Sequence, residues 1–458
     1  MKKIVGVFWH TSALRLKNIA EILTAEADIK IYSTRTLEQD RDEYDSLCGD
    51  IDKADIPILN LPNGEEVCSS IKKYAADREI KTIYVGANAL ENIEDKETLE
   101  ISVLANEYYV QNGKENMVNL LRYAANMAGD HNISYEQPVK MPWETLCHPS
   151  EPDRYYNSSE EYFRDHPRSD KGTVGILMSR SSLVNEDFAV EKNIIEKLEE
   201  KGFSVLPIFA YSWEEPSIGA KGSKYAIEKF CFDKNGNSIL DGLIKMTSFF
   251  IGDKADADSE KLLNRLRCPI FKPICSYNMS INEWAENKDG TISDVAWSIA
   301  LPELEGNIEP LFIGGLENDE LDGNRHPIES RVEKLTERVS KWVSLKKKET
   351  SEKKAVLILN NNPCASVEAS VGGGAKLDTL ESVVRIMESM KASGYTIEDI
   401  PESGEDLIKM IMERKAVSEF RWTTTGEIVE KGGCIYQMDK ETYESIFSTA
   451  FQRMRRRQ

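Results

Sequence analysis

Short apolar runs and amphipathic stretches alternate over the first 130 residues of the chain. Residues 3–9 form an apolar run that predicts a strand, and residues 12–24 carry apolar side chains at helical spacing. Three more apolar runs predict strands, each followed by a helical stretch, at residues 28–32, 55–59 and 81–85. Strands joined by helices of this length pair in parallel, because a parallel connection needs a long crossover. The pattern therefore predicts a doubly wound α/β domain over residues 1–140.

Residues 141–170 interrupt this alternation. The segment holds Pro142, Pro149, Pro152 and Pro167, and proline removes a backbone donor and resists regular structure. We interpret the segment as a connector that lies against the body of the protein, because aromatic residues stand between the prolines: Tyr155, Tyr156, Tyr162 and Phe163.

The alternation resumes in a second predicted domain, residues 171–346. A strand at 173–178 precedes a helix at 186–201, which ends at Gly202, the residue type favoured just past a helix end. A long helix at about 328–345 closes the domain, after strands at 204–209, 242–246 and 269–273.

Residues 347–458 are predicted to begin a third α/β domain. A charged linker at 346–354 precedes an apolar run at 355–359 that predicts a strand, and helices are expected at 379–392 and 441–457. The predicted fold class is thus α/β, with several doubly wound, mostly parallel-sheet units of flavodoxin-like or Rossmann-like type in series.

Composition excludes several classes of partner. The chain has 58 basic and 78 acidic side chains, a net charge of −20, which disfavours nucleic acid. No apolar run reaches the roughly 18–20 residues of a membrane-spanning helix. The eight cysteines form no Cys-x-x-Cys pair, which indicates free thiols in a reducing cytoplasm and no zinc site.

Two loops are candidate anion sites. The Gly-rich loop at 372–376 precedes a helix, but Lys376 is followed by Leu377 rather than the Ser or Thr of a P-loop, so a tight turn is the better interpretation. Arg180 follows the strand at 173–178, outside the carboxyl end, where open α/β sheets bind ligands. It can hold a carboxylate in bidentate fashion or pair with a nearby Asp or Glu at the surface.

Two carboxylates, Glu303 and Glu305, stand one residue apart beside a proline and a glycine. On an extended segment they would point the same way and serve a cation or an acid–base pair, although solvated strands show the same pattern more often. The five histidines suggest no metal site, and no Ser-His-Asp or Cys-His arrangement is evident. Residue chemistry alone therefore identifies no catalytic residue and no metal ligand.

An ordered set of segments resembles one known family. Residues 174–177 with Arg180, Leu183 and Asn185 are followed by the segment ALPELEG at 300–306. Further matches follow in order: Arg331, Arg338, Trp342, Asn362, Pro363, Gly372, Ala375, Leu377, Asp378, Gly394, Tyr395 and Pro401. This set resembles the large subunit of cobaltochelatase (the CobN type) and the H subunit of magnesium chelatase, strongly from Val174 to Pro401. ALPELEG is similar to the family's Leu-Pro-Glu-Leu-Asp-Gly signature, with Glu305 in place of Asp.

The resemblance implies a function. Such a subunit belongs to an ATP-dependent ligase that inserts cobalt, or magnesium, into a tetrapyrrole, here a corrin-type ring of cobalamin biosynthesis. The metal ion and the tetrapyrrole are its substrates, and separate AAA+ partner subunits hydrolyse ATP, which agrees with a chain that lacks a P-loop.

The family's presumed metal-insertion region lies downstream of any segment matched here. The resemblance therefore implies the amino-terminal part of the subunit, inactive alone: a piece of a longer chain, a shortened gene product, or one half of a split subunit. Arg180 and Asn185 are the expected ligand contacts, with Glu303 and Glu305 behind them on one surface made by strand-end loops.

Two other functions stay open. The chain is alternatively a non-catalytic, two-lobed protein that binds a small molecule or a tetrapyrrole. It is otherwise an assembly module that contacts AAA+ subunits without binding a ring.

Overall fold

The computed structural model describes most of the chain in two compact units, Met1–Lys346 and Lys347–Gln458. The described residues are 1–61, 65–87, 89–91, 93–248, 250–251, 257–291, 295–317, 323–360, 371–374, 376–413, 424–430 and 436–455. Within these ranges, no helix combines the length and apolar character that a membrane crossing requires.

A four-stranded parallel sheet forms the centre of the first lobe, residues 1–140, in the order β2-β1-β3-β4. The strands are β1 (Lys3–Phe8), β2 (Asp28–Ser33), β3 (Ile56–Leu59) and β4 (Ile83–Tyr84). All four strand predictions are confirmed, and β1 and β3 are almost fully buried, as expected for a sheet covered on both faces.

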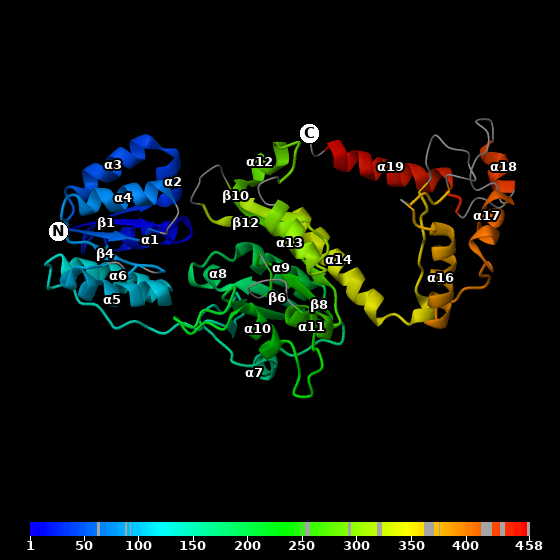
Figure 1. Cartoon of the computed structure of the whole chain (residues 1–458), viewed down its shortest axis with the longest axis horizontal. Helices are drawn as coiled ribbons and strands as arrows, with labels where there is room; N and C mark the ends of the chain where they lie inside the picture. The colour runs from blue at the N-terminus through cyan, green and yellow to red at the C-terminus, as the bar shows by residue number, and fades with distance from the viewer. Residues whose placement is uncertain are drawn as a thin grey trace. The chain divides into compact units, whose positions relative to one another are not determined.

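Helices cover both faces of this sheet (Figure 1). One face packs against α1 (His10–Ile22), α5 (Lys96–Gln111) and α6 (Lys114–Met127), where Leu16, Ile101 and Leu120 are buried with Ile4 and Phe8. The other face packs against α2 (Thr34–Gln39), α3 (Arg41–Ile51) and α4 (Glu66–Ala76). The lobe is therefore a three-layer, doubly wound unit.

The connector, residues 141–170, packs against the second lobe. Tyr156 and Tyr162 are buried, so the expected contact between its aromatic residues and the body is confirmed. It also holds two short elements that the proline content did not predict, β5 (Thr145–Leu146) and α7 (Ser159–Asp165).

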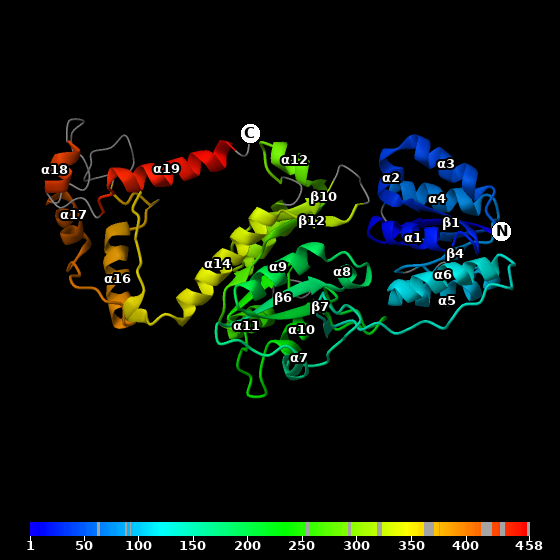
Figure 2. The same cartoon turned by 180° about the vertical axis from the view of Figure 1, so that it is seen from behind.

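The second lobe, residues 171–346, is built on the sheet β5-β7-β6-β8-β9, in which only β5 is antiparallel. The four parallel strands confirm the prediction and are β6 (Thr173–Ser179), β7 (Ser204–Ala210), β8 (Gly242–Lys245) and β9 (Ile270–Phe271). Helices α9 (Ala189–Glu200) and α14 (Glu329–Lys347) cover one face, and α7, α10 (Gly222–Phe230) and α11 (Ala257–Leu266) cover the other, as both views show (Figures 1 and 2).

Several elements of the second lobe were not predicted. They include α10 and α11, and also α8 (Arg180–Val184), α12 (Ile281–Glu286) and a small sheet of β10 (Ile274–Ser280), β11 (Phe312–Leu316) and β12 (Arg325–Pro327). The extended segment expected around Glu303 and Glu305 is wrong. A π-helical turn, η2 (Ala296–Ala300), runs directly into α13 (Leu301–Leu304), whose Pro302 suits a first helical turn.

The unit Lys347–Gln458 has helices in its described residues: η3 (Thr350–Glu352), α16 (Thr379–Ala392), α17 (Gly404–Glu413), α18 (Thr425–Glu430) and α19 (Lys440–Arg455). The predicted helices at 379–392 and 441–457 are confirmed within two residues. The predicted strand at 355–359 is wrong, because the described part of this unit supplies no neighbouring strand and leaves Val356 and Ile358 exposed. At the Gly-rich loop, Leu377 N donates to Gly374 O, which closes a tight turn; Ala375, Asn362 and Pro363 lie outside the described residues.

Candidate functional site

The two parallel sheets share one strand order. In each lobe, the first parallel strand along the chain (β1 or β6) lies between the second and the third. The second and third strands are therefore added on opposite sides of the first. The crevice outside the carboxyl end of such a strand is where open α/β sheets bind ligands. His10 and Thr11 follow β1, and Ser181 and Ser182 follow β6.

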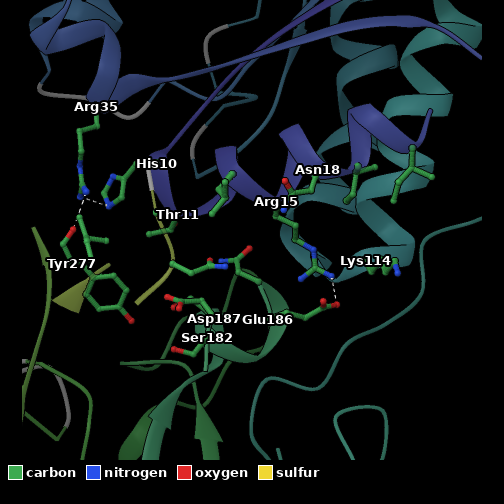
Figure 3. Close-up of a pocket in the computed structure, with 18 residues that line it drawn as sticks. His10, Thr11, Arg15, Asn18, Arg35, Lys114, Ser182, Glu186, Asp187 and Tyr277 are labelled. Carbon is green, nitrogen blue, oxygen red and sulfur yellow. Dashed lines mark hydrogen bonds and ion pairs between the residues drawn. The ribbon is translucent and has the colours of Figure 1, made fainter. Parts of the chain in front are cut away.

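Residues from both crevices line one pocket of about 260 Å³, here called the inter-lobe pocket (Figure 3). The polar groups of the first lobe are His10, Thr11, Arg15, Asn18, Arg35 and Lys114. Those of the second lobe are Ser181, Ser182, Asn185, Glu186, Asp187, Tyr277 and Asn324. A chain of net charge −20 thus places three cationic side chains on one wall of a cavity.

Arg15 extends from α1 across one end of the pocket. Its side chain is only 10% exposed, and its Nη2 donates to Glu186 Oε1 at 2.9 Å. Its Nη1 is buried and donates to no acceptor among the described residues. Burial lowers the pKa of Arg15 and Glu186 opposes that shift, so this guanidinium depends on a nearby anion.

Arg35, which follows β2, bridges the lobes at the other end. Its Nη1 donates to the backbone oxygen of Tyr277 at 2.8 Å, and its Nη2 donates to Asn278 Oδ1 at 2.9 Å. The same Nη2 lies 2.6 Å from His10 Nε2. Figure 3 marks the contacts of Arg35 with His10 and with Tyr277. Arginines of the first lobe therefore bind groups of the second lobe on both sides of the pocket.

A buried arginine supports the wall of the second lobe. Arg325 donates to Asp187 Oδ2 at 2.8 Å, to Glu191 Oε1 at 3.0 Å and to Ser182 Oγ at 3.1 Å, and its guanidinium stacks on Tyr277. Burial alone would lower the pKa of Arg325, but Glu191 beside it raises that pKa well above its usual value. Three residues that line the pocket, Ser182, Asp187 and Tyr277, thus share one cationic support.

Arg180 is placed at the predicted strand end but has different partners from those expected. It is the first residue of α8 and is 5% exposed, and its guanidinium donates to the backbone oxygens of Pro142 and Gln111 at 2.9 and 2.6 Å. Its guanidinium also stacks on Trp143, and burial lowers its pKa to about 10, against an opposing effect of Glu144. The interpretation as a surface arginine paired with a carboxylate is wrong: Arg180 joins α5, the connector and β6.

The other expected ligand contacts, Asn185, Glu303 and Glu305, do not lie together in one site. Asn185 caps the carboxyl end of α8 and lines the inter-lobe pocket, where its Oδ1 is buried and accepts no hydrogen bond from the described residues. The side chain of Glu305 is buried and accepts hydrogen bonds from Lys245 Nζ and, at 2.6 Å, from Ile251 N, whereas Glu303 is exposed on α13. Lys245 ends β8, so Glu305 lies at the same sheet edge as Arg180, but the two glutamates do not act as a pair.

Sequence reasoning missed Arg15, Arg35 and Lys114. The rule that pointed to Arg180 also applies to the end of the first strand, where His10 follows, and this signal was available. No cluster of three or more His, Cys, Asp or Glu side chains suited to a metal ion occurs in the residues that the structure describes.

Comparisons with known proteins agree over most of the chain. A family model described as CobN/Magnesium Chelatase matches residues 106–458. An uncharacterised protein of Methanocaldococcus jannaschii is 40% identical over 343 residues, which are 74% of this chain and 27% of that protein. The magnesium-chelatase subunit ChlH of Oryza sativa subsp. indica, a chloroplastic protein, is 26% identical over 367 residues, 76% of this chain and 25% of that subunit.

Similarity extends to cobaltochelatases. The aerobic cobaltochelatase subunit CobN of Pseudomonas aeruginosa is 26% identical over 337 residues, 70% of this chain and 26% of that subunit. The structure of the catalytic subunit of cobaltochelatase from Mycobacterium tuberculosis matches with a TM-score of 0.57 and 18% identity, over 90% of this chain and 33% of that chain, a likeness of fold. The chain thus spans about a quarter of the length of the curated relatives that it matches.

Proposed function

Because the chain belongs to the CobN/magnesium chelatase family, we propose that it forms the tetrapyrrole-holding part of the large subunit of a metal chelatase. One observation carries the proposal: the strand-end crevices of two doubly wound lobes face one cationic pocket. The pocket binds an anionic edge of the ring.

The chemistry of the pocket fits a ring that carries carboxylate substituents. The guanidinium of Arg15 matches a carboxylate in its planar fork, and Lys114 adds an exposed positive charge at the pocket. Asn185 Oδ1 supplies an acceptor for an amide or hydroxyl of the same edge. These groups bind and orient the ring.

Size limits what the pocket holds. Its volume of about 260 Å³ is below the roughly 300–1,000 Å³ of pockets that enclose a drug-sized ligand. The pocket therefore takes a substituent of the ring, and the macrocycle lies at its mouth.

The proposed reaction is insertion of cobalt into a corrin-type ring, with ATP hydrolysed by AAA+ partner subunits. The relative named as a cobaltochelatase supports the choice of metal. The sequence of this chain has no Gly-Lys-Ser or Gly-Lys-Thr loop, which supports the assignment of ATP chemistry to partners. Insertion by this chain alone, measured as loss of free-base absorbance with cobalt, would contradict the proposed division of labour.

Ring binding is tested by titration with deuteroporphyrin IX, a metal-free porphyrin with propionate groups, followed by visible absorbance. We expect the acid to bind, its methyl ester to bind at least about tenfold more weakly, and Lys114→Gln to weaken binding of the acid about threefold. Lys53→Gln, the same change at an exposed lysine outside the pocket, is the control and leaves binding unchanged. Equal binding of acid and ester, or binding of neither, refutes the carboxylate site.

Binding of a tetrapyrrole without insertion is a second candidate function, which the position of the pocket between two lobes favours. The two functions differ in one assay. A chelatase subunit supports metal insertion when the downstream half of the subunit and the AAA+ subunits of its organism are added, and a simple binding protein does not.

A further inference from the structure

We propose that Glu186 is a built-in competitor for the carboxylate site on Arg15 and sets the selectivity of the inter-lobe pocket for anionic ligands. The inference rests on the proposed function, because it concerns the same site, and it names the residue that a ligand carboxylate must displace.

Arg15 makes a single hydrogen bond to Glu186, and one of its terminal nitrogens has no acceptor among the described residues. A guanidinium and a carboxylate can form two parallel hydrogen bonds, but a single contact joins Arg15 Nη2 to Glu186 Oε1. Arg15 Nη1 remains buried without an acceptor among the described residues, and an unmade hydrogen bond is costly in a buried position. A carboxylate with free choice of orientation would therefore bind Arg15 better than Glu186 does.

The backbone explains why Glu186 makes only this limited contact. Glu186 has φ of +57°, a left-handed conformation that is uncommon for residues other than glycine, asparagine and aspartate. It is held there on both sides: Glu186 N donates to Leu183 O at 3.1 Å, and the next residue, Asp187, is bonded to the buried Arg325. The backbone of Glu186 is thus held in place, and its carboxylate reaches Arg15 from that position. The dashed line in Figure 3 marks this contact.

The exchange of one carboxylate for another is favourable for two reasons. Arg15 is nine-tenths buried and keeps a counter-charge before and after the exchange. Glu186 is 58% exposed, so its released carboxylate returns to water at little cost. A neutral ligand cannot supply the counter-charge and leaves Glu186 in place.

Other charged groups of the pocket do not provide the same competition. Asp187 is bound to Arg325, and Arg35 donates to backbone and amide oxygens of the second lobe. Lys114 also attracts an incoming carboxylate, but Glu186 is paired with Arg15, so binding at Lys114 displaces no carboxylate of the protein. The pair Arg15–Glu186 is therefore the point at which the charge of the ligand decides binding.

The test is titration of Glu186→Gln with deuteroporphyrin IX and its methyl ester. We expect the variant to bind the acid about threefold more tightly than the native chain and the ester unchanged, as loss of a weak competing ion pair predicts. Glu21→Gln removes the same charge from an exposed position on α1 outside the pocket lining, and it leaves both affinities unchanged. In an Arg15→Gln background, Glu186→Gln has no effect on binding of the acid.

Unchanged or weaker binding of the acid by Glu186→Gln overturns the inference, and so does equal tightening of acid and ester. If the native chain binds neither porphyrin, the proposed function fails, and benzoate still tests the exchange. Benzoate must then raise the thermal midpoint of Glu186→Gln more than that of the native chain, and equal shifts overturn the inference.

Discussion

Replacement of Arg325 by methionine removes the support beneath the second-lobe wall of the pocket. Methionine keeps a long unbranched side chain and removes the charge and all the hydrogen bonds that Arg325 donates to Asp187, Glu191 and Ser182. The side chains of Arg325 and Glu191 are 2% and 1% exposed, so water cannot replace the lost contacts without rearrangement of the lobe.

The expected loss of stability is large. Removal of one partner of a buried ion pair costs roughly 3–5 kcal/mol, because the other charge is left buried without compensation. Asp187 is 17% exposed and regains part of its hydration, so Glu191 accounts for most of the loss. For a lobe of this size, the unfolding midpoint then falls by about 6–20 °C.

The pH dependence of the loss has a definite sign. Burial raises the pKa of Glu191, an effect that Arg325 opposes, so removal of Arg325 raises that pKa further. The folded variant then binds the proton of Glu191 more tightly than the unfolded chain does. The loss of stability of Arg325→Met relative to the native chain is smallest below the ordinary carboxyl pKa. It grows as the pH rises through the raised pKa of Glu191.

The assay is urea denaturation of the native chain, Arg325→Met and Arg325→Met/Glu191→Gln. We expect the double variant to recover part of the lost free energy of unfolding, because the uncompensated charge is gone. Lys192→Met, at a half-exposed lysine of α9, is the control and changes the free energy of unfolding by at most about 0.5 kcal/mol. A single variant within about 1 kcal/mol of the native chain refutes the reasoning, as does a double variant no more stable than the single one.

Three further changes follow from the structure. Arg180→Ala leaves two backbone oxygens without their charged donor and lowers the free energy of unfolding by about 2–3 kcal/mol in urea; a loss below about 0.5 kcal/mol contradicts this. Burial lowers the pKa of His166, so its contribution to stability is present above the ordinary histidine pKa and is lost as pH falls toward the lowered one. His166→Phe should therefore lose less of its thermal midpoint than the native chain between about pH 7.5 and about pH 5.5. Gly222→Ala and Gly236→Ala both place a side chain at positive φ, but only the first brings Cβ to 2.5 Å from the Trp213 backbone. Urea denaturation should therefore show a loss of at least about 3 kcal/mol in the free energy of unfolding for Gly222→Ala and of about 1 kcal/mol for Gly236→Ala.

The central strands of both lobes were predictable because burial on two faces makes them continuous apolar runs, as in β7, where every residue is buried. The small sheet was not, because only its middle strand, β11, has that pattern. The outer strand β10 mixes buried and exposed residues, and β12 consists of Arg325, His326 and Pro327. Arg325 is buried by ion pairs rather than by apolar character. The run at 355–359 shows the opposite failure. An apolar run forms a strand only where a neighbouring strand accepts its hydrogen bonds, and the described residues of that unit supply no such strand.

The position of Arg180 was predictable, and its partners were not. A strand followed by a polar loop indicates a sheet edge, but the carbonyls that Arg180 contacts belong to Gln111 and Pro142, which lie 69 and 38 residues away in sequence. Glu305 illustrates the same limit. Its spacing from Glu303 suggested a shared surface, and the helix α13 instead placed Glu305 against Lys245, 60 residues earlier.

The inter-lobe pocket depends on contacts of longer range still. Arg15 and Glu186 are 171 residues apart, and Arg35 and Tyr277 are 242 residues apart. These bridges are polar, and a polar contact between lobes is one that a charged ligand can replace at similar energy. Ligand binding and lobe docking therefore draw on the same arginines, and a carboxylate that takes Arg15 from Glu186 also removes one of the bonds between the lobes. The ring edge must then supply contacts to both walls, which a ligand with a carboxylate beside a hydrogen-bond donor can do through Arg15 and Asn185.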